Sequence, residues 1–455
     1  MIPSVLNRAA AAPEYVRRRF RVHVAVAAIV VLFILRHVVT ALVFPPFTGH
    51  DEVAHYGYLR TVAFEKRLPH LSDPLPPSAA DYRAYALDWV EGPGYQYTAL
   101  HPPLYYALMA PVLMIDPTAS PEEHLYRVRL AGVWIGVLTV VLAFALAQTV
   151  FPGNSFIALT ATSLVAFQPQ VSYEAAILNN DALGIAGTSL LLWMIARAIR
   201  EEFSTPSAVA VGVSLGIALL AKSTALVLVP AIGLAILAVL GLSPARVIRV
   251  GITVLVPAAV ISAPWYLHLY RTYGDLSGLA ALGELQRDWN HPAGTFFELL
   301  FSTRFLSERF RETWGEFGWR RAPLDPALLW AIGTAAAVAC AGLLRVALLT
   351  TGFAHASADR VSLSRRQRIT VVILFVSCVG AYLAVIQFGT RFVLTQARYF
   401  FPVVNAAAVL AALGFEALTP DRSRPAVQAG LLVALAVLNL FIYTRAVIPA
   451  WHFPR

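Results

Sequence analysis

The sequence predicts an all-α polytopic membrane protein that crosses the bilayer with about eleven transmembrane helices. Of its 455 residues, 58% are hydrophobic and only 13% are charged, whereas an ordinary soluble protein carries about 25% charged residues. Apolar runs of about 20 residues recur along the chain, and a helix of this length spans a hydrocarbon core. The net charge of +9 would suggest nucleic acid for a soluble chain. In a membrane protein its placement matters more, so we expect no nucleic-acid partner.

The first predicted span is the apolar run 22–44, which directly follows a cluster of arginines. This run is too long for a signal-peptide core and lacks a clear small-residue cleavage site, so we expect it to be retained. The run 104–115 is shorter and suits an interfacial or re-entrant helix better than a span. Ten further runs fit transmembrane helices: 128–150, 155–173, 182–198, 207–221, 224–241, 247–268, 326–344, 369–388, 400–418 and 426–447.

The basic residues predict the orientation of these spans. Counting 104–115 as a span would place most of the arginines outside, whereas leaving it out gives the positive-inside pattern. We therefore expect one integral domain, 1–455, in the cytoplasmic membrane, with a cytoplasmic N-terminus and with 45–127 and 269–325 as long extracytoplasmic segments. The cytoplasmic segments would then hold Arg17, Arg18, Arg19, Arg21, Arg197, Arg200, Arg246, Arg249, Arg345, Arg360, Arg365, Arg366, Arg368, Arg422 and Arg424.

Two acidic positions on the expected outer side are candidates for chemistry. Asp51 and Glu52 lie just beyond the first span, and a carboxylate there fits a general base toward a hydroxyl group. A solvated start of a loop explains the same residues. Asp181 lies before the fourth span, where a helix N-cap is the alternative explanation.

A metal ion is the other ligand that this acidic cluster suggests. His50, Asp51, Glu52 and His55 offer ligand atoms, but the chain contains no Asp-x-Asp pair. We therefore expect no metal and no other cofactor, and leave a divalent cation as the weaker alternative.

Two cations on the same side are candidates for binding a lipid-linked phosphate. Lys222, one of the two lysines in the chain, lies at the turn between the fifth and sixth spans. Arg398 precedes Tyr399 at the start of the tenth span and offers a bidentate guanidinium. A snorkelling lysine and an interfacial Arg–Tyr anchor are the alternatives.

Motifs for other chemistry are missing from the sequence. It contains no phosphate-binding Gly-x-x-x-x-Gly-Lys-Ser/Thr loop, no His-Glu-x-x-His and no Gly-x-Ser-x-Gly. Nucleotide hydrolysis is therefore not expected as a source of energy. A transporter or a flippase of lipid-linked glycans is the alternative function, but it should show paired halves and charges near the midplane. Here the acidic residues concentrate in the outer segments.

The order of several short motifs resembles polytopic glycosyltransferases of the GT-C fold that use polyprenyl-phosphate sugars. The likeness is strongest to bacterial relatives of the dolichyl-phosphate-mannose protein mannosyltransferases. The motifs are Asp51-Glu52-x-x-His55, His101-Pro102-Pro103-Leu104-Tyr105-Tyr106, Asn180-Asp181, Ala221-Lys222-Ser223-Thr224, Ala263-Pro264-Trp265-Tyr266, Trp314-Gly315-x-Phe317-Gly318-Trp319 and Gln396-Ala397-Arg398-Tyr399-Phe400-Phe401-Pro402.

The resemblance implies an enzyme and a set of site residues. The enzyme would move a sugar, with inversion, from a polyprenyl-phosphate donor to a lipid, glycan or protein acceptor at the outer face of the membrane. The first outer segment would form juxtamembrane helices over the active site, and the chain would lack the soluble outer domain of many relatives. The implied base is Asp51, and the implied substrate-binding residues are Glu52, His55, His101, Asp181, Lys222, Arg398 and Tyr399. His50 departs from the pattern, because relatives often have a proline or a small residue there.

Overall fold

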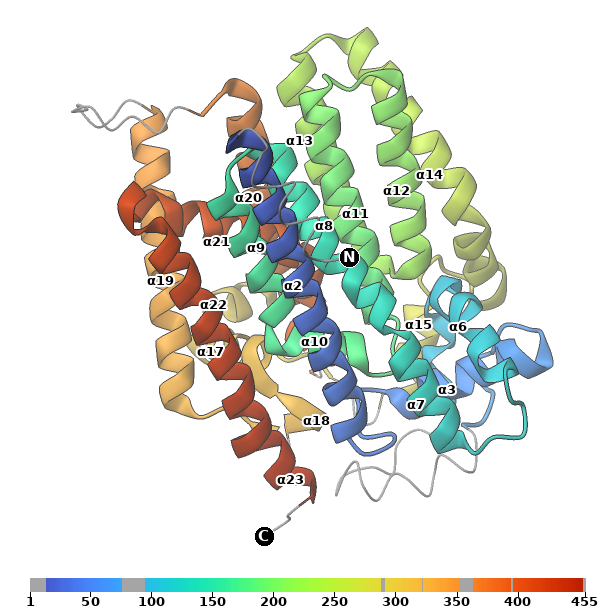
Figure 1. The fold of residues 1–455 in the computed structure, drawn as a ribbon. Coiled ribbons are helices and arrows are strands. Elements are labelled where there is room, and N and C mark those ends of the chain that lie inside the picture. Colours follow the sequence, from blue (N-terminus) through green and yellow to red (C-terminus); the bar gives the residue numbers. More distant parts are fainter. Residues whose placement is uncertain are drawn as a thin grey trace.

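The computed structural model describes residues 14–75, 95–287, 291–320, 322–351, 363–393 and 396–452. In this part of the chain the protein is an all-α bundle of long helices, as the sequence predicts (Figure 1). Short helices and loops gather at one end of the bundle, the lower end in the view of Figure 1. We call this end the loop-rich end.

The helices of the first half carry the first outer segment and the centre of the bundle. They are α2 (Glu14–Val43), α3 (Glu52–Arg60), η1 (Thr61–Glu65), η2 (Tyr97–Leu100), α6 (Leu104–Met114), α7 (Pro121–Ala131), α8 (Val133–Val150), α9 (Ser155–Phe167), α10 (Pro169–Ala176), α11 (Asp181–Arg200), α12 (Thr205–Ala221), η3 (Ser223–Leu228) and α13 (Val229–Leu240).

The second half adds a long helix, the second outer segment and the C-terminal helices. Its elements are α14 (Pro244–Tyr273), α15 (Leu279–Leu285), α16 (Phe296–Phe301), α17 (Thr303–Gly315), α18 (Phe317–Arg320), the two-residue strand β1 (Ala322–Pro323), α19 (Pro326–Thr351), α20 (Arg365–Gly389), η4 (Ala397–Val403), α21 (Val404–Leu418), η5 (Asp421–Ser423), α22 (Arg424–Phe441), η6 (Ile442–Val447) and α23 (Ile448–His452).

Nine helical segments of the described residues are long and apolar enough to cross a membrane, and each corresponds to a predicted span. The other two predicted spans, 155–173 and 207–221, contain the shorter apolar helices α9 and α12. The run 155–173 is divided because Gln168 ends α9 and Pro169 starts α10, where a missing N–H costs nothing. The exact count of eleven therefore stays a prediction.

The short run that we excluded from the spans forms α6, a helix of 11 residues. Such a helix is about 16 Å long, roughly half the thickness of a hydrocarbon core. Its buried face, which includes Tyr105 and Tyr106, packs against α3 and α7 near the loop-rich end (Figure 1). This geometry is that of a juxtamembrane helix.

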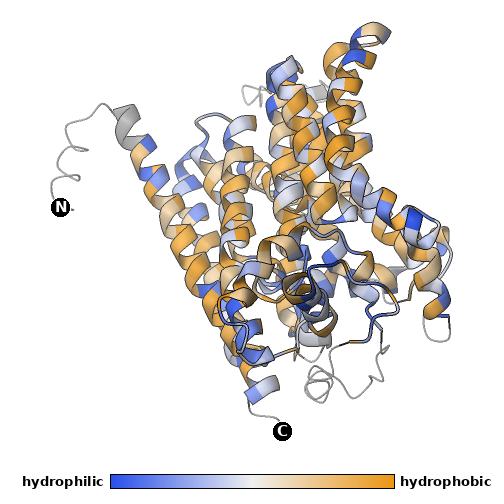
Figure 2. Ribbon diagram, turned by 90° about the vertical axis from the view of Figure 1, so that its right-hand side faces the viewer, coloured by the Kyte–Doolittle hydropathy of each residue, from blue (hydrophilic) through white to orange (hydrophobic). Residues whose placement is uncertain are grey.

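The long helices are mostly apolar along their length, whereas hydrophilic residues concentrate near the two ends of the bundle (Figure 2). In the most apolar windows of α14 and α19 only 17% and 11% of the residues are buried inside the protein. Such outward-facing apolar surface is typical of helices that contact lipid. The corresponding window of α11 is 72% buried, so α11 lies at the centre of the bundle.

Candidate active site

Asp51 lies in the turn that joins α2 to α3, and its backbone is left-handed with φ of 58°. Aspartate is among the few residues that accept this conformation at a modest cost, and such positions cluster at functional sites. The side chain does not cap α3. Instead, the Tyr97 hydroxyl donates to its Oδ1 over 2.9 Å, and the guanidinium of Arg398 forms an ion pair with its Oδ2.

Arg398 connects Asp51 to a second carboxylate. Its Nη1 lies 3.3 Å from Oδ2 of Asp181, while the other oxygen of Asp181 forms an ion pair with the Lys222 ammonium group. We call Asp51, Arg398, Asp181 and Lys222 the charge network. It contains two carboxylates and two cations, so its formal charge is zero. The ring of Tyr399 lies 5.6 Å from both the Arg398 guanidinium and the Lys222 ammonium.

The other three residues of the charge network lie at or next to the ends of helices, close to Asp51. Asp181 is the first residue of α11, and Arg398 lies in η4 just before α21. Lys222 follows the last residue of α12 in an extended conformation. Its side chain runs along Gly184, where an added Cβ would come within 2.9 Å of the Lys222 Cβ. Gly184 is therefore required for the path of the lysine side chain.

A carboxylate from the long segment 269–325 holds η4 in place. Glu312 of α17 accepts a hydrogen bond from the backbone N–H of Ala397 over 3.0 Å. It is also ion-paired with Arg309 over 2.9 Å, and both side chains are nearly fully buried. The position of Arg398 thus depends on a segment about 85 residues earlier in the chain.

Two histidines from the long segment 45–127 pack beside the charge network. His55 Nδ1 lies 2.7 Å from the Tyr106 hydroxyl, and His101 Nδ1 lies 2.9 Å from the side-chain oxygen of Asn180. The two rings meet edge to face with centroids 5.3 Å apart. Burial and the charge of Lys222 lower the pKa of His101 to about 4. Burial and His101 likewise hold the pKa of His55 well below its usual value, so both imidazoles are neutral near pH 7.

Glu52 points away from the charge network although it is next to Asp51 in the sequence. Arg129 donates to both of its oxygens, over 2.6 and 2.9 Å. The backbone N–H groups of Gly49 and Leu178 complete its contacts, and both side chains of the ion pair are fully buried. This geometry gives Glu52 an anchoring role. Its contact with substrate stays a prediction.

The protein environment keeps Asp51 ionised and lowers the pKa of Lys222. Burial alone would raise the pKa of the Asp51 carboxyl, but the charge of Arg398 and its hydrogen bond to Asp51 bring that pKa below its usual value. Burial lowers the pKa of Lys222, and Asp181 offsets this effect only in part. Asp51 is thus a carboxylate at neutral pH, but it is a weak base while Arg398 holds it.

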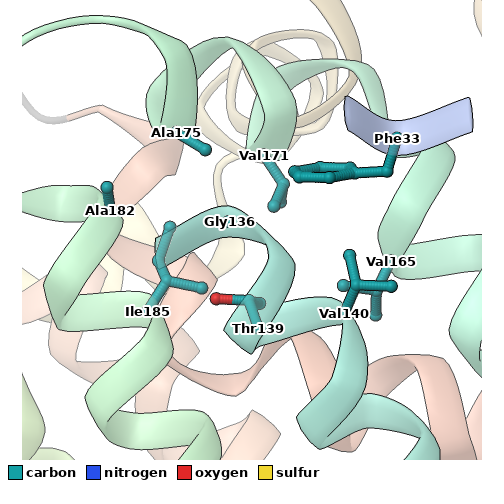
Figure 3. Close-up of a pocket in the computed structure, with 9 residues that line it drawn as sticks. All are labelled: Phe33, Gly136, Thr139, Val140, Val165, Val171, Ala175, Ala182 and Ile185. Carbon is teal, nitrogen blue, oxygen red and sulfur yellow. The ribbon is translucent and has the colours of Figure 1, made fainter. Parts of the chain in front are cut away.

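An apolar cavity of about 350 Å³ adjoins η4, the segment that carries Arg398, although no residue of the charge network lines it. It lies between α9, α17, α20, η4 and α21, and Ala397, the neighbour of Arg398, is part of its wall. Leu306, Tyr382 and Phe400 line it, together with Arg309 at a polar border. A second void of about 10 Å³, between α2, α8, α9, α10 and α11, is too small for a ligand (Figure 3).

Metal binding is not indicated by the residues that the structure describes. Among them, no group of three or more His, Cys, Asp or Glu side chains is arranged to hold a metal ion. The expectation that no cofactor is needed stays a prediction.

All eight predicted site residues are in the described part of the chain, and five of them meet: Asp51, Asp181, Lys222, Arg398 and Tyr399. Three further contributors escape prediction from the sequence. Tyr97 is apparent there only as an aromatic residue that could stack on a sugar ring. Glu312 lies in a run of ordinary helix-surface residues, and Gly184 in an apolar span. None carries a local signal, because their partners are distant in sequence.

Comparisons with known proteins concern the family and the fold of the chain. Residues 100–271 match the family described as dolichyl-phosphate-mannose-protein mannosyltransferase. No curated protein sequence matches at a significant level. ArnT from Cupriavidus metallidurans has a similar structure: in its apo state it is 15% identical, with 94% of this chain and 73% of that chain covered and a TM-score of 0.55. Its complex with undecaprenyl phosphate gives the same identity and coverage and a TM-score of 0.50.

The oligosaccharyltransferase of Archaeoglobus fulgidus, in complex with zinc and sulfate, is also similar. It is 14% identical, with 92% of this chain and 53% of that chain covered and a TM-score of 0.50. At these identities the likeness concerns the fold. The chain is therefore a multi-pass membrane protein with a GT-C-like fold, and its resemblance to the dolichyl-phosphate-mannose protein mannosyltransferases is confirmed over residues 100–271.

Proposed function

We propose that this protein is an inverting glycosyltransferase that moves a sugar from a polyprenyl-phosphate donor to a hydroxyl-bearing lipid, glycan or protein acceptor. The observation that carries the proposal is the charge network itself. Four ionised side chains from distant segments converge near an apolar cavity, in a fold similar to that of ArnT. Burying four charges together costs free energy, and clusters of this kind concentrate at functional sites.

In the proposed reaction, Asp51 takes the proton of the acceptor hydroxyl as its oxygen attacks the anomeric carbon of the sugar. The bond between that carbon and the phosphate oxygen breaks, and its electron pair leaves with the polyprenyl phosphate. Attack from the face opposite the leaving group inverts the anomeric centre. The phosphate–sugar bond supplies the driving force, so no nucleotide is required.

The leaving phosphate would be bound by Arg398 and Lys222, the two cations of the charge network. The Nε–H of Arg398 is buried and has no hydrogen-bond partner among the described residues, so it is available to an anion. Two positive charges close to the phosphate stabilise the charge that develops as the bond breaks. Asp181 would keep both cations in position.

The apolar cavity would hold the first isoprene units of the donor. Its wall reaches Ala397, so a chain in it would leave the phosphate beside Arg398. ArnT, which has a similar fold, was crystallised with undecaprenyl phosphate, a lipid of this class. Tyr97 and His101, next to Asp51 and Asp181, would contact the sugar or the acceptor.

We further propose that the site faces the extracytoplasmic side of the membrane. α11 starts at Asp181 in the charge network and runs about 30 Å to Arg197 and Arg200 at its other end. Arginines near the ends of membrane helices favour the cytoplasmic side. The loop-rich end would then lie outside.

The test is sugar transfer by the purified full-length protein in detergent, with radiolabelled polyprenyl-phosphate sugars as donors. Asp51→Asn is expected to abolish transfer, because the amide cannot accept the proton. Asp116→Asn, a surface carboxylate on the same predicted side, is the charge-matched control and should keep full activity. Full transfer by Asp51→Asn would refute the assignment. A wild-type protein that moves no sugar but transports a lipid-linked glycan would favour the transporter alternative.

A further inference from the structure

We infer that the donor phosphate and Asp51 compete for Arg398, so that donor binding releases the base. This inference rests on the proposed function and concerns how the same site is regulated. The charge network is closed in the structure, because every carboxylate in it is paired with a cation. The proposed base is therefore occupied when no donor is bound.

Charge balance makes simple addition of the phosphate unfavourable. The two carboxylates already neutralise the two cations, and all four side chains are at most 15% exposed. An added phosphate would leave at least one uncompensated negative charge in a nearly buried site, which is costly. Exchange does not change the net charge, but it gives the phosphate a cation partner on Arg398 and leaves the unpaired negative charge on Asp51, the most exposed of the four side chains.

Asp51 is the carboxylate that can leave. Asp181 contacts both Arg398 and Lys222, so it stays paired with Lys222 if Arg398 turns away. Asp51 has only Arg398 as an ion-pair partner among the described residues, and its side chain is more exposed than that of Asp181, 15% against 4%. The buried, unpartnered Nε–H of Arg398 offers the phosphate a first contact before the exchange.

Tyr97 would keep the released carboxylate in place. Its hydroxyl donates to Oδ1, whereas Arg398 binds Oδ2, so the exchange leaves this hydrogen bond intact. Once Arg398 no longer neutralises it, Asp51 gains affinity for a proton. The base thus becomes effective only when a donor is present, and donor binds before the acceptor hydroxyl is deprotonated.

The test is the affinity of the purified full-length protein for undecaprenyl phosphate alone, measured by calorimetry or by displacement of a fluorescent analogue. Asp51→Asn removes the competing charge and should bind this lipid about tenfold more tightly than the wild type. Asp116→Asn removes one surface charge and should leave the affinity unchanged. Equal or weaker binding by Asp51→Asn would overturn the inference.

Tyr97→Phe should change the affinity for undecaprenyl phosphate in the direction opposite to Asp51→Asn. The substitution removes only a hydroxyl group, so the protein should remain folded. Without the tyrosine hydrogen bond, Asp51 depends more on Arg398, so undecaprenyl phosphate should bind roughly two- to threefold more weakly. Tighter binding by Tyr97→Phe would contradict the exchange. If neither the wild type nor the variants bind the lipid, the proposed function itself fails, which is a different result from binding that ignores Asp51.

Discussion

Asp51 and Glu52 are adjacent carboxylates that the protein uses in opposite ways. Glu52 is fully buried and receives hydrogen bonds from Arg129 and from two backbone N–H groups. Asp51 is 15% exposed and is held by Arg398 and a tyrosine hydroxyl, which are both side chains. Backbone N–H donors cannot turn away from a carboxylate to make room for a ligand, whereas side-chain partners such as those of Asp51 can. The two carboxylates thus differ in the accessibility of their partners and in whether those partners can be replaced, which fits Glu52 as a structural residue and Asp51 as the proposed base.

The largest expected effect is a loss of stability when the buried ion pair of Glu52 and Arg129 is broken. Glu52→Ala leaves the buried guanidinium of Arg129 without its counter-ion, which costs about 3–5 kcal/mol of folding free energy. The variant should aggregate, or unfold at a much lower temperature than the wild type, when heated samples are analysed by size-exclusion chromatography. Asp51→Asn should keep a melting temperature close to that of the wild type, because asparagine tolerates the left-handed backbone. A Glu52→Ala protein as stable as the wild type would invalidate the anchoring role.

A smaller effect is expected at Gly184, where an added side chain would displace Lys222 of the charge network. The added Cβ of Gly184→Ala would meet the Cβ of Lys222 at 2.9 Å and push the lysine away from Asp181. Donor affinity should fall about tenfold, whereas the protein should remain folded. The measurement is the Kd for undecaprenyl phosphate, with Gly233→Ala as the control because nothing lies near the added Cβ there. An unchanged Kd in Gly184→Ala would remove Lys222 from the phosphate site.

The smallest expected effect concerns pH. The pKa of His101 is lowered to about 4 in the folded protein from a usual value near 6.5, so the folded state binds the proton less readily than the unfolded state. Its contribution to stability is complete above pH 6.5 and declines as the pH falls from 6.5 to 4. His101→Gln should therefore flatten the pH dependence of the melting temperature in this window. An unchanged slope would show that His101 is not held in its neutral form.

The positions of the site residues are easier to predict from the sequence than their pairing. The ends of the predicted spans and the order of the motifs are enough to assign Asp51, Asp181, Lys222 and Arg398 to one side of the membrane. The pairing of Arg398 with Asp51 and Asp181 depends on packing between segments more than 200 residues apart, for which one sequence carries no signal. Glu52 illustrates this limit, because nothing local to it points to Arg129, 77 residues away.

For the spans, too, the sequence predicts some features and not others. Hydropathy locates the long helices because a lipid-facing surface requires apolar residues at almost every position. It does not show the break between α9 and α10, although Pro169 is a visible sign of it. The count of spans therefore depends on whether a broken apolar run still crosses the bilayer, which composition alone does not decide.

The distance along the chain between Asp51 and Arg398 also has a consequence in time. The two residues are 347 positions apart, whereas Tyr97 follows Asp51 after only 46. At a synthesis rate of 5–20 residues per second, the tyrosine arrives within about 2 to 9 seconds and the arginine only after roughly 17 to 70 seconds. During most of its synthesis the protein thus carries Asp51, the proposed base, without the cation that is its ion-pair partner in the folded structure. Of the two side chains that bind Asp51 in that structure, only Tyr97 is available before the C-terminal helices are made.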